Sequence, residues 1–276
     1  MARVRTAHRA IGITVASAFL FVASTIDLAM AQGVLTLSDQ RAQADAYFVQ
    51  GGPPVGNFGL QQDPTGADFY QIESQSFTGG GFSGRGYAEH GATFTPSSPL
   101  VGGAFSTLIM DACSSAEVTR SAIGPNAYEQ AYGLASGVVE FQVAVPTFWT
   151  LNGASQGASA PGAGLHIVSG VVELIDINSG LPVFSQVDSS MNGVGNWAVS
   201  IAAGGVLSPG SYRMAWSHES LAAGGNTSFG FFPTALGGLP LASCINCTLN
   251  LTPVPAPPTC AILGALACGL ASRRRR

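Results

Sequence analysis

The sequence predicts an all-β protein, and more narrowly an antiparallel β-sandwich with Gly-rich loops. Several short stretches alternate apolar and polar residues with a period of two, as half-buried strands do. Glycine-rich breaks at residues 51–56, 79–86 and 153–164 separate these stretches. After residue 50 no amphipathic helical pattern longer than about three turns is visible. A sandwich, with a jelly-roll arrangement as one form of it, fits these observations.

The alternation also places individual strands. Residues 37–49 could begin a short helix capped by Ser38, but their two-residue period favours a strand. Residues 139–145, 197–201 and 212–216 show the same period, with their apolar side chains on one face. These four segments are the clearest strands in the sequence.

A β-hairpin is predicted between residues 171–175 and 182–187. The connecting residues 176–181 include Asp, Asn, Ser and Gly, which are typical of a hairpin turn. A second turn is predicted at residues 208–210, which read Ser-Pro-Gly. The first turn supports antiparallel pairing of its flanking strands.

The three tryptophans fall into two groups. Trp197 and Trp216 lie on the apolar phase of their strands, so we expect them in the core. Trp149 follows Phe148 at a strand end and is less constrained by the pattern. It is the residue that the sequence offers for stacking against a sugar ring.

The first 31 residues have the three parts of a signal peptide. Arginines at positions 3, 5 and 9 precede an apolar run at residues 11–26, and Ala29 and Ala31 supply the small residues of a cleavage site. The run is shorter than the ~20 residues of a membrane span, which disfavours a retained anchor. A buried N-terminal helix is the other alternative. We expect cleavage after Ala31 by signal peptidase.

The last 24 residues form a second distinctive segment. A stiff proline-rich stretch at residues 253–259 includes Pro255, Ala256 and Pro257 and leads into an apolar run at residues 260–271. At about 1.5 Å per residue, the 14 residues 259–272 would span about 21 Å, short of a hydrocarbon core of about 30 Å. The chain then ends in four arginines, which should stay in the cytoplasm: Arg273, Arg274, Arg275 and Arg276.

This C-terminal segment resembles the PEP-CTERM sorting signal, in which a Pro-rich motif precedes a short helix and an Arg cluster. Here Pro-Ala-Pro at residues 255–257 stands in place of the usual Pro-Glu-Pro. The resemblance implies transient contact with the inner membrane, tail removal by an exosortase-like enzyme, and delivery to the outer surface or extracellular matrix. The chain then divides into a signal peptide (1–31), a β-sandwich (32–252) and a sorting tail (253–276).

The charge of the body excludes one class of partner. The sequence has no Lys, and residues 32–272 hold four basic and 14 acidic residues, a net charge of −10. Such a body repels phosphate backbones, so nucleic acid is not an expected partner.

Each apparent catalytic or metal-binding motif in the sequence lacks an element that its chemistry requires. Residues 153–157 match the G-x-S-x-G elbow around Ser155, with Asp176 or Asp188 and then His218 in hydrolase order, but no helix follows the serine. The histidines at positions 90, 166 and 218 form no closely spaced pair. Residues 176–180 resemble the start of a calcium loop, but Val187 stands where the bidentate Glu belongs. We therefore expect no enzyme and no cofactor, while calcium elsewhere stays open.

Three cysteines fall in the body. In an oxidising compartment, Cys113, Cys244 and Cys247 allow three single pairings. A redox-active Cys-x-x-Cys would need a helix start, which the region lacks. A local disulfide between Cys244 and Cys247, with Cys113 free, is the pairing that we expect.

These features point to a structural or adhesive protein of the bacterial cell surface, working in an exopolysaccharide layer. A carbohydrate-binding surface module is the alternative, and it would need exposed aromatic side chains on one sheet face or in a loop cluster. A secreted hydrolase is a third, and it would need acids paired across a cleft.

Overall fold

The computed structural model describes residues 33–50, 53–63, 68–79, 81–96, 101–120, 127–159, 164–224 and 244–254. Most of these residues lie in strands, and none of them lies in a helix. The part of the chain that the structure describes therefore contains no helix able to cross a membrane. The strands are β1 (Gly33–Gln50), β2 (Val55–Asp63), β3 (Phe69–Gly79), β4 (Phe82–Thr95), β5 (Ala104–Phe105), β6 (Thr107–Arg120), β7 (Ala127–Val143), β8 (Thr147–Gly157), β9 (Leu165–Asp176), β10 (Leu181–Met191), β11 (Trp197–Leu207), β12 (Gly210–Ala223) and β13 (Cys244–Pro253).

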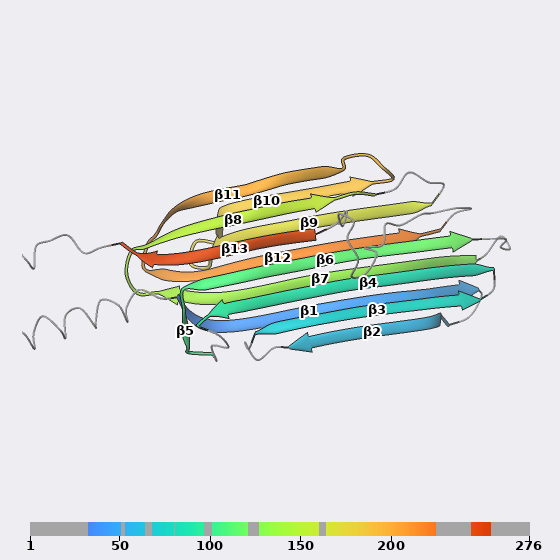
Figure 1. Cartoon of the computed structure of the whole chain (residues 1–276), viewed down its shortest axis with the longest axis horizontal. Helices are drawn as coiled ribbons and strands as arrows, with labels where there is room; N and C mark the ends of the chain where they lie inside the picture. The colour runs from blue at the N-terminus through green and yellow to red at the C-terminus, as the bar shows by residue number, and fades with distance from the viewer. Residues whose placement is uncertain are drawn as a thin grey trace, which may run out of the picture.

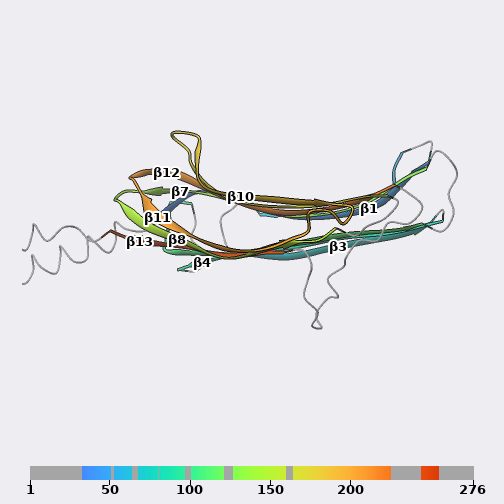
Figure 2. The same cartoon turned by 90° about the horizontal axis from the view of Figure 1, so that it is seen from above.

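Two antiparallel sheets lie face to face (Figures 1 and 2). Sheet A has the order β10-β9-β12-β7-β1-β2, with the short β5 paired to β1, and sheet B has the order β11-β8-β13-β6-β4-β3. The predicted all-β sandwich is confirmed. The jelly-roll form is not, because an eight-stranded jelly roll has another number and order of strands.

The chain changes sheets at both lateral edges of the sandwich. The edge strand β2 of sheet A leads to the edge strand β3 of sheet B, and on the opposite side β10 leads to β11. The pairs β1–β2, β3–β4 and β9–β10 are antiparallel neighbours within one sheet. Every connection from β4 to β9 and from β11 to β13 also changes sheets. The edge strands are β10 and β2 in sheet A, and β11 and β3 in sheet B.

The period-two pattern places apolar side chains between the sheets. In β7, the odd-numbered residues from 129 to 143 are buried, while the even-numbered ones from 130 to 142 are half-buried or exposed on the outer face. Trp216, 1% exposed, is among the largest side chains of the core, as predicted. Gly137 gives it room, because a Cβ at this position would lie 2.2 Å from Cζ2 of Trp216. Trp197 is only half-buried, so the core expectation holds for it in part.

In one half of the sandwich, the backbones of the two sheets approach so closely that some positions leave no room for a side chain. A Cβ on Gly86 of β4 would lie 2.1 Å from the carbonyl oxygen of Tyr132 in β7. A Cβ on Gly133 would lie 2.1 Å from the carbonyl oxygen of Tyr87. Here the backbones of opposite sheets are in contact, and the surrounding core consists mostly of alanines, namely Ala44, Ala46, Ala88, Ala116 and Ala131.

The predicted hairpin is confirmed. β9 ends at Asp176 and β10 begins at Leu181, in antiparallel register. In the turn, the backbone N–H of Asn178 donates to Oδ1 of Asp176 (2.9 Å), and Gly180 adopts a φ of 70°. The predicted Ser-Pro-Gly turn joins β11 of sheet B to β12 of sheet A, so its flanking strands do not pair with each other. Residues 37–49 lie within β1, as expected.

Two predicted glycine-rich breaks are partly wrong. β8 continues through Gly153 to Gly157, and β4 contains Gly84 and Gly86. At Gly153 a Cβ would lie 2.0 Å from the carbonyl oxygen of Asn246 in the neighbouring strand β13. These glycines permit close backbone approach within strands rather than ending them.

Candidate binding face

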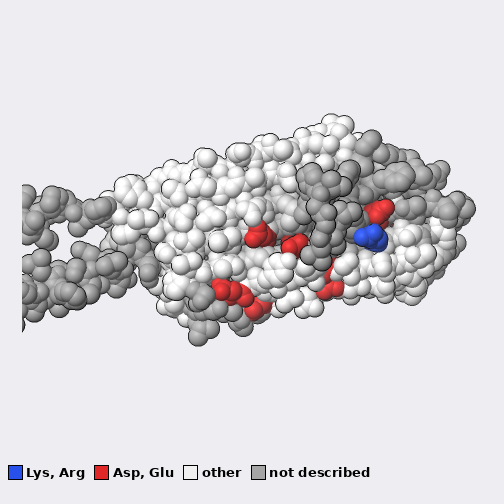
Figure 3. All heavy atoms as spheres, in the orientation of Figure 1, with Lys and Arg blue, Asp and Glu red and all other residues white. Residues whose placement is uncertain are grey.

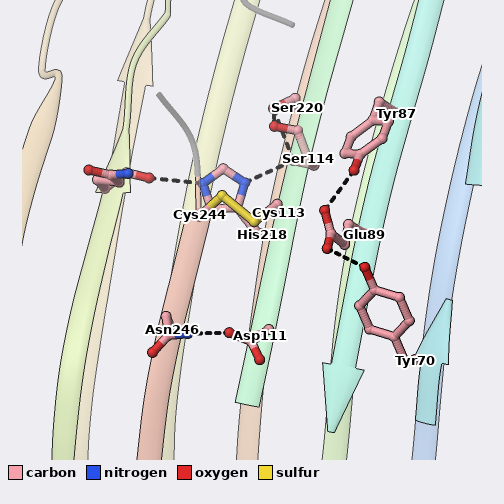
Figure 4. The surroundings of a disulfide bond; sticks show 11 residues. Tyr70, Tyr87, Glu89, Asp111, Cys113, Ser114, His218, Ser220, Cys244 and Asn246 are labelled. Carbon is pink, nitrogen blue, oxygen red and sulfur yellow. Dashed lines mark hydrogen bonds between the residues drawn. A yellow bond between two sulfur atoms is a disulfide. The ribbon is translucent and has the colours of Figure 1, made fainter. Parts of the chain in front are cut away.

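The outer face of sheet B carries a group of polar and aromatic side chains around a disulfide bond (Figure 4). Four adjacent strands contribute: β3, β4, β6 and β13. The register places Tyr70 opposite Gly91, which in turn lies opposite Asp111, and Asp111 lies opposite Asn246. We name the following residues the tyrosine–carboxylate cluster: Tyr70, Tyr87, Glu89, Asp111 and Asn246.

Glu89 is the acceptor at the centre of this cluster. The hydroxyl of Tyr70 donates to its Oε1 (2.7 Å), and the hydroxyl of Tyr87 donates to its Oε2 (2.6 Å), as Figure 4 shows. The hydrogen bond to Glu89 raises the pKa of Tyr70, and burial followed by the same kind of bond raises the pKa of Tyr87. Both phenols therefore stay protonated and hold the carboxylate in one orientation.

Asp111 extends the cluster toward β13. Asn246 Nδ2 donates to its Oδ1. Burial is the main cause that raises the pKa of Asp111, and repulsion from Glu89 acts in the same direction. Between the two carboxylates Gly91 leaves a flat area, since a Cβ there would only touch the ring of Tyr70 (3.4 Å) and the side chain of Asp111 (3.5 Å).

The tyrosine–carboxylate cluster combines an exposed ring with fixed polar groups. Tyr70 is 61% exposed, so one ring is available to a ligand while its hydroxyl stays bonded to Glu89. Figure 3 shows that charged side chains are few on one broad face of the molecule and are separated by large uncharged areas. Such a surface can stack a ring and hydrogen-bond hydroxyl groups, without strong attraction to either sign of charge.

The disulfide bond joins Cys113 of β6 to Cys244 of β13, with 4.2 Å between the Cα atoms. The predicted pairing of Cys244 with Cys247 is wrong. Residues three apart on a strand point to opposite faces, so Cys244 lies half-buried on the outer face while Cys247 is fully buried between the sheets. Burial raises the pKa of the free Cys247 thiol to about 12. In the sequence, the apolar residues 245, 247, 249 and 251 alternate with polar residues, and this signal could have excluded the predicted pair.

The predicted stacking residue, Trp149, belongs to the core. It is 4% exposed, and its ring packs edge-on against Phe184 of the opposite sheet at 6.5 Å. Neighbouring residues on a strand face opposite sides, and it is Phe148, 44% exposed, that faces outward. Leu151 lies two residues after Trp149, and residues two apart on a strand share a face. This apolar neighbour was the signal in the sequence that could have placed Trp149 in the core.

Ser155 does not lie in a strand-to-helix turn. It lies inside β8, is 1% exposed, and accepts a hydrogen bond from Nε1 of Trp197 (2.9 Å). His218 is bonded elsewhere, through Nδ1 to Ser114 Oγ (2.8 Å). Its Nε2 lies 3.3 Å from the carbonyl oxygen of Gln156. Asp176 ends β9 and Asp188 lies in β10, and neither is a partner of His218.

The sequence analysis missed a buried polar network between the sheets. His218 of β12 in sheet A contacts Ser114 of β6 in sheet B, and the Ser114 hydroxyl donates to Ser220 (3.0 Å), as seen in Figure 4. All three side chains are at most 1% exposed. Burial lowers the pKa of His218 to about 4, so the imidazole is neutral. A Ser–His pair can activate a nucleophile, but this one is enclosed by both sheets and acts as a polar link between them.

The three histidines of the body lie scattered in strands, and all of them are buried. His90, His166 and His218 all lie in strands, and none is more than 2% exposed. His90 packs edge-on against Phe69 (5.2 Å) and Trp216 (5.5 Å), and burial lowers its pKa to about 4. Among the described residues no group of three or more His, Cys, Asp or Glu side chains could hold a metal ion.

The predicted signals at the two ends lie outside the described residues. This applies to the cleavage residues Ala29 and Ala31 and to the sorting residues Pro255, Ala256, Pro257, Arg273, Arg274, Arg275 and Arg276.

Comparisons with known proteins add little to the geometry. No family model and no curated protein matches the chain. One solved structure, described as "Structure of infectious bursal disease virus Gx strain", matches over 83% of this chain at 10% identity with a TM-score of 0.15. The chain spans 64% of that viral chain. A likeness this weak carries no argument about function.

Proposed function

We propose that this chain is an exported protein of a bacterial cell surface or extracellular matrix, with a structural or adhesive role in an exopolysaccharide layer. The observation that carries the proposal is the disulfide bond between Cys113 and Cys244. Structural disulfides form and persist in oxidising compartments and are rare in the cytosol. This argument is independent of the two ends of the sequence.

The two ends support the same proposal through their composition. In this account signal peptidase removes residues 1–31, and residues 253–276 form a sorting tail with a short membrane helix. The tail holds the protein briefly in the inner membrane until an exosortase-like enzyme cuts near residues 255–258. A 14-residue apolar run is too short for a stable anchor, which favours a temporary stop.

A second candidate function is carbohydrate binding through the tyrosine–carboxylate cluster. The specific observation in its favour is the exposed ring of Tyr70, beside two carboxylates and the amide of Asn246 on a flat sheet face. Sugars present apolar ring faces to aromatic side chains and hydroxyl groups to carboxylates and amides. In this reading exopolysaccharide is the partner.

Thiol labelling of cell fractions tests the export proposal. In protein taken from the cell surface, Cys113 and Cys244 should resist alkylation until a reductant is added. A Cys113→Ser variant serves as the control, because its Cys244 should then be alkylated without reductant. Protein found wholly in the cytoplasm with both thiols reactive would refute the proposal.

Affinity electrophoresis in gels containing the producer's exopolysaccharide tests the second candidate. Tyr70→Ala should weaken retardation about tenfold, which corresponds to about 1.4 kcal/mol. Phe148→Ala is the matched control, because Phe148 is an exposed aromatic on the same sheet outside the tyrosine–carboxylate cluster. Equal retardation of both variants and wild type would reject this binding site.

A further inference from the structure

Of the four edge strands, β11 has the least protection against pairing with another chain. Its sequence, WAVSIAAGGVL, contains no charged residue and no proline. Natural proteins usually protect exposed sheet edges with charges, prolines, bulges or covering segments. The other edges have such features, and β11 does not.

The two edges of sheet A and the edge β3 are blocked in different ways. β10 carries Pro182 and Asp188, with a register irregularity between Pro182 and Phe184. β2 and β3 are tied together across the sandwich, because Asn57 Nδ2 donates to the backbone oxygen of Ser76 (2.5 Å). β3 also carries a charge at Glu73.

The β11 strand is also regular. It pairs with β8 without interruption from Trp197 opposite Gly157 to Leu207 opposite Thr147. In an antiparallel sheet, every second residue of an edge strand points its N–H and C=O away from its neighbour, which leaves about five such pairs free on a strand of this length. Within the described ranges no strand pairs with this edge.

We propose that the β11 edge is a self-association surface, to which a second copy of this chain adds its own β11 in antiparallel orientation. A two-fold axis at the central residue places Ala202 opposite Ala202 of the second copy and Ser200 opposite Gly204. This register keeps the faces matched: exposed residues 198, 200 and 202 meet exposed residues 206, 204 and 202. The two copies of sheet B then form one continuous sheet.

A second copy fits this edge for reasons of size and charge. The exposed side chains nearest the axis are alanine, serine and glycine, which allow two strands to approach without steric conflict. Identical uncharged strands meet without local repulsion, whereas like charges directly opposite each other destabilise a pair. The inference goes beyond the proposed function, since it concerns a strand edge and not the face that carries the tyrosine–carboxylate cluster.

Cysteine cross-linking tests the register directly. In the full chain with Cys260→Ser and Cys268→Ser, an Ala202→Cys variant should form a disulfide-linked dimer under mild oxidation. A Ser200→Cys variant should not, because two copies of residue 200 would lie about 13 Å apart along the strands, beyond the reach of a disulfide. A covalent dimer at position 202 alone supports the proposal. Equal yields at both positions, or none at either, would overturn it.

Sedimentation of variants with an added charge gives a second test of the proposal. Ala202→Lys should bring two positive charges together at the axis and shift the population to monomer. Asn152→Lys is the matched control, because Asn152 is exposed and lies opposite Ala202 on β8, one strand away from the edge. Monomer at all concentrations in wild type, or the same self-association in both variants, would overturn the proposal.

Discussion

Three buried histidines make the stability of the fold sensitive to acid. His90 is enclosed by Phe69 and Trp216, and His218 by Ser114, Ser220 and the ring of Trp197 (6.1 Å). Burial lowers both pKa values from 6.5 to about 4, and it lowers that of His166 as well. The unfolded chain therefore binds more protons than the folded chain between pH 6.5 and 4.

We expect the free energy of unfolding to fall as the pH falls from 6.5 to 4. Each of His90 and His218 contributes a loss on the order of 3 kcal/mol at the lower limit, partly offset by Asp111, whose raised pKa acts in the opposite direction. Denaturant melts at several pH values measure this. His90→Phe should flatten this pH profile, because it removes one of the titrating groups. The substitution breaks no hydrogen bond, since neither ring nitrogen of His90 has a hydrogen-bond partner in the described structure. An unchanged slope would contradict the assignment.

The tryptophans give a second prediction at the residue scale. Trp216→Ala and Trp149→Ala should each cost about 3–5 kcal/mol of unfolding free energy, because both side chains are buried in the core. Phe148→Ala is the exposed control on the strand of Trp149, and it should cost much less. Chemical denaturation of the three variants checks this. A small loss for Trp149→Ala would mean that its ring does not support the core.

At the element scale, glycines set the distance between the sheets. Gly86→Ala in β4 should destabilise the fold by more than about 2 kcal/mol, because its Cβ would meet backbone atoms of the opposite sheet. Gly91→Ala on the same strand is the control, since its Cβ makes ordinary contacts on the outer face. Thermal melts of both variants provide the comparison, and similar midpoints would contradict the close contact between the sheets.

The disulfide bond gives a second prediction for the elements. Cys113→Ser should lower the free energy of unfolding by about 2–5 kcal/mol, since the bond closes a loop between residues 131 apart in the sequence. Cys247→Ser leaves the bond intact. The change in unfolding free energy that it causes relative to wild type should therefore be the same with and without reductant. Denaturation with and without reductant separates the two. If reductant does not destabilise wild type, the bond does not contribute to stability.

The sequence predicted where the strands lie better than it predicted which strands pair with each other. Alternation at residues 139–145 and 212–216 identifies which side chains face inward, so strand positions and Trp216 could be placed. It carries no information about which strand lies beside which, and β13 pairs with β6 across more than 100 residues of sequence. The tyrosine–carboxylate cluster depends on that pairing, and so it could not be foreseen.

At the scale of the whole molecule, the structure joins a low-charge sandwich to an oxidised cysteine pair. Two sheets with an uncharged edge and a flat outer face suit a protein that works among other copies and polymers outside the cell. The proposed route requires both ends of the chain to be removed. It leaves residues 32 to about 257 as the released protein.

The intact mass of protein released from the cell surface tests this account most directly. The expected species begins at Gln32, lacks residues 260–276, and gains about two mass units on reduction of its single disulfide. Material from cells lacking the exosortase-like enzyme is the control and should retain the tail. Released protein that begins at Met1, or that still carries Cys260 through Arg276, would contradict the proposed export and sorting.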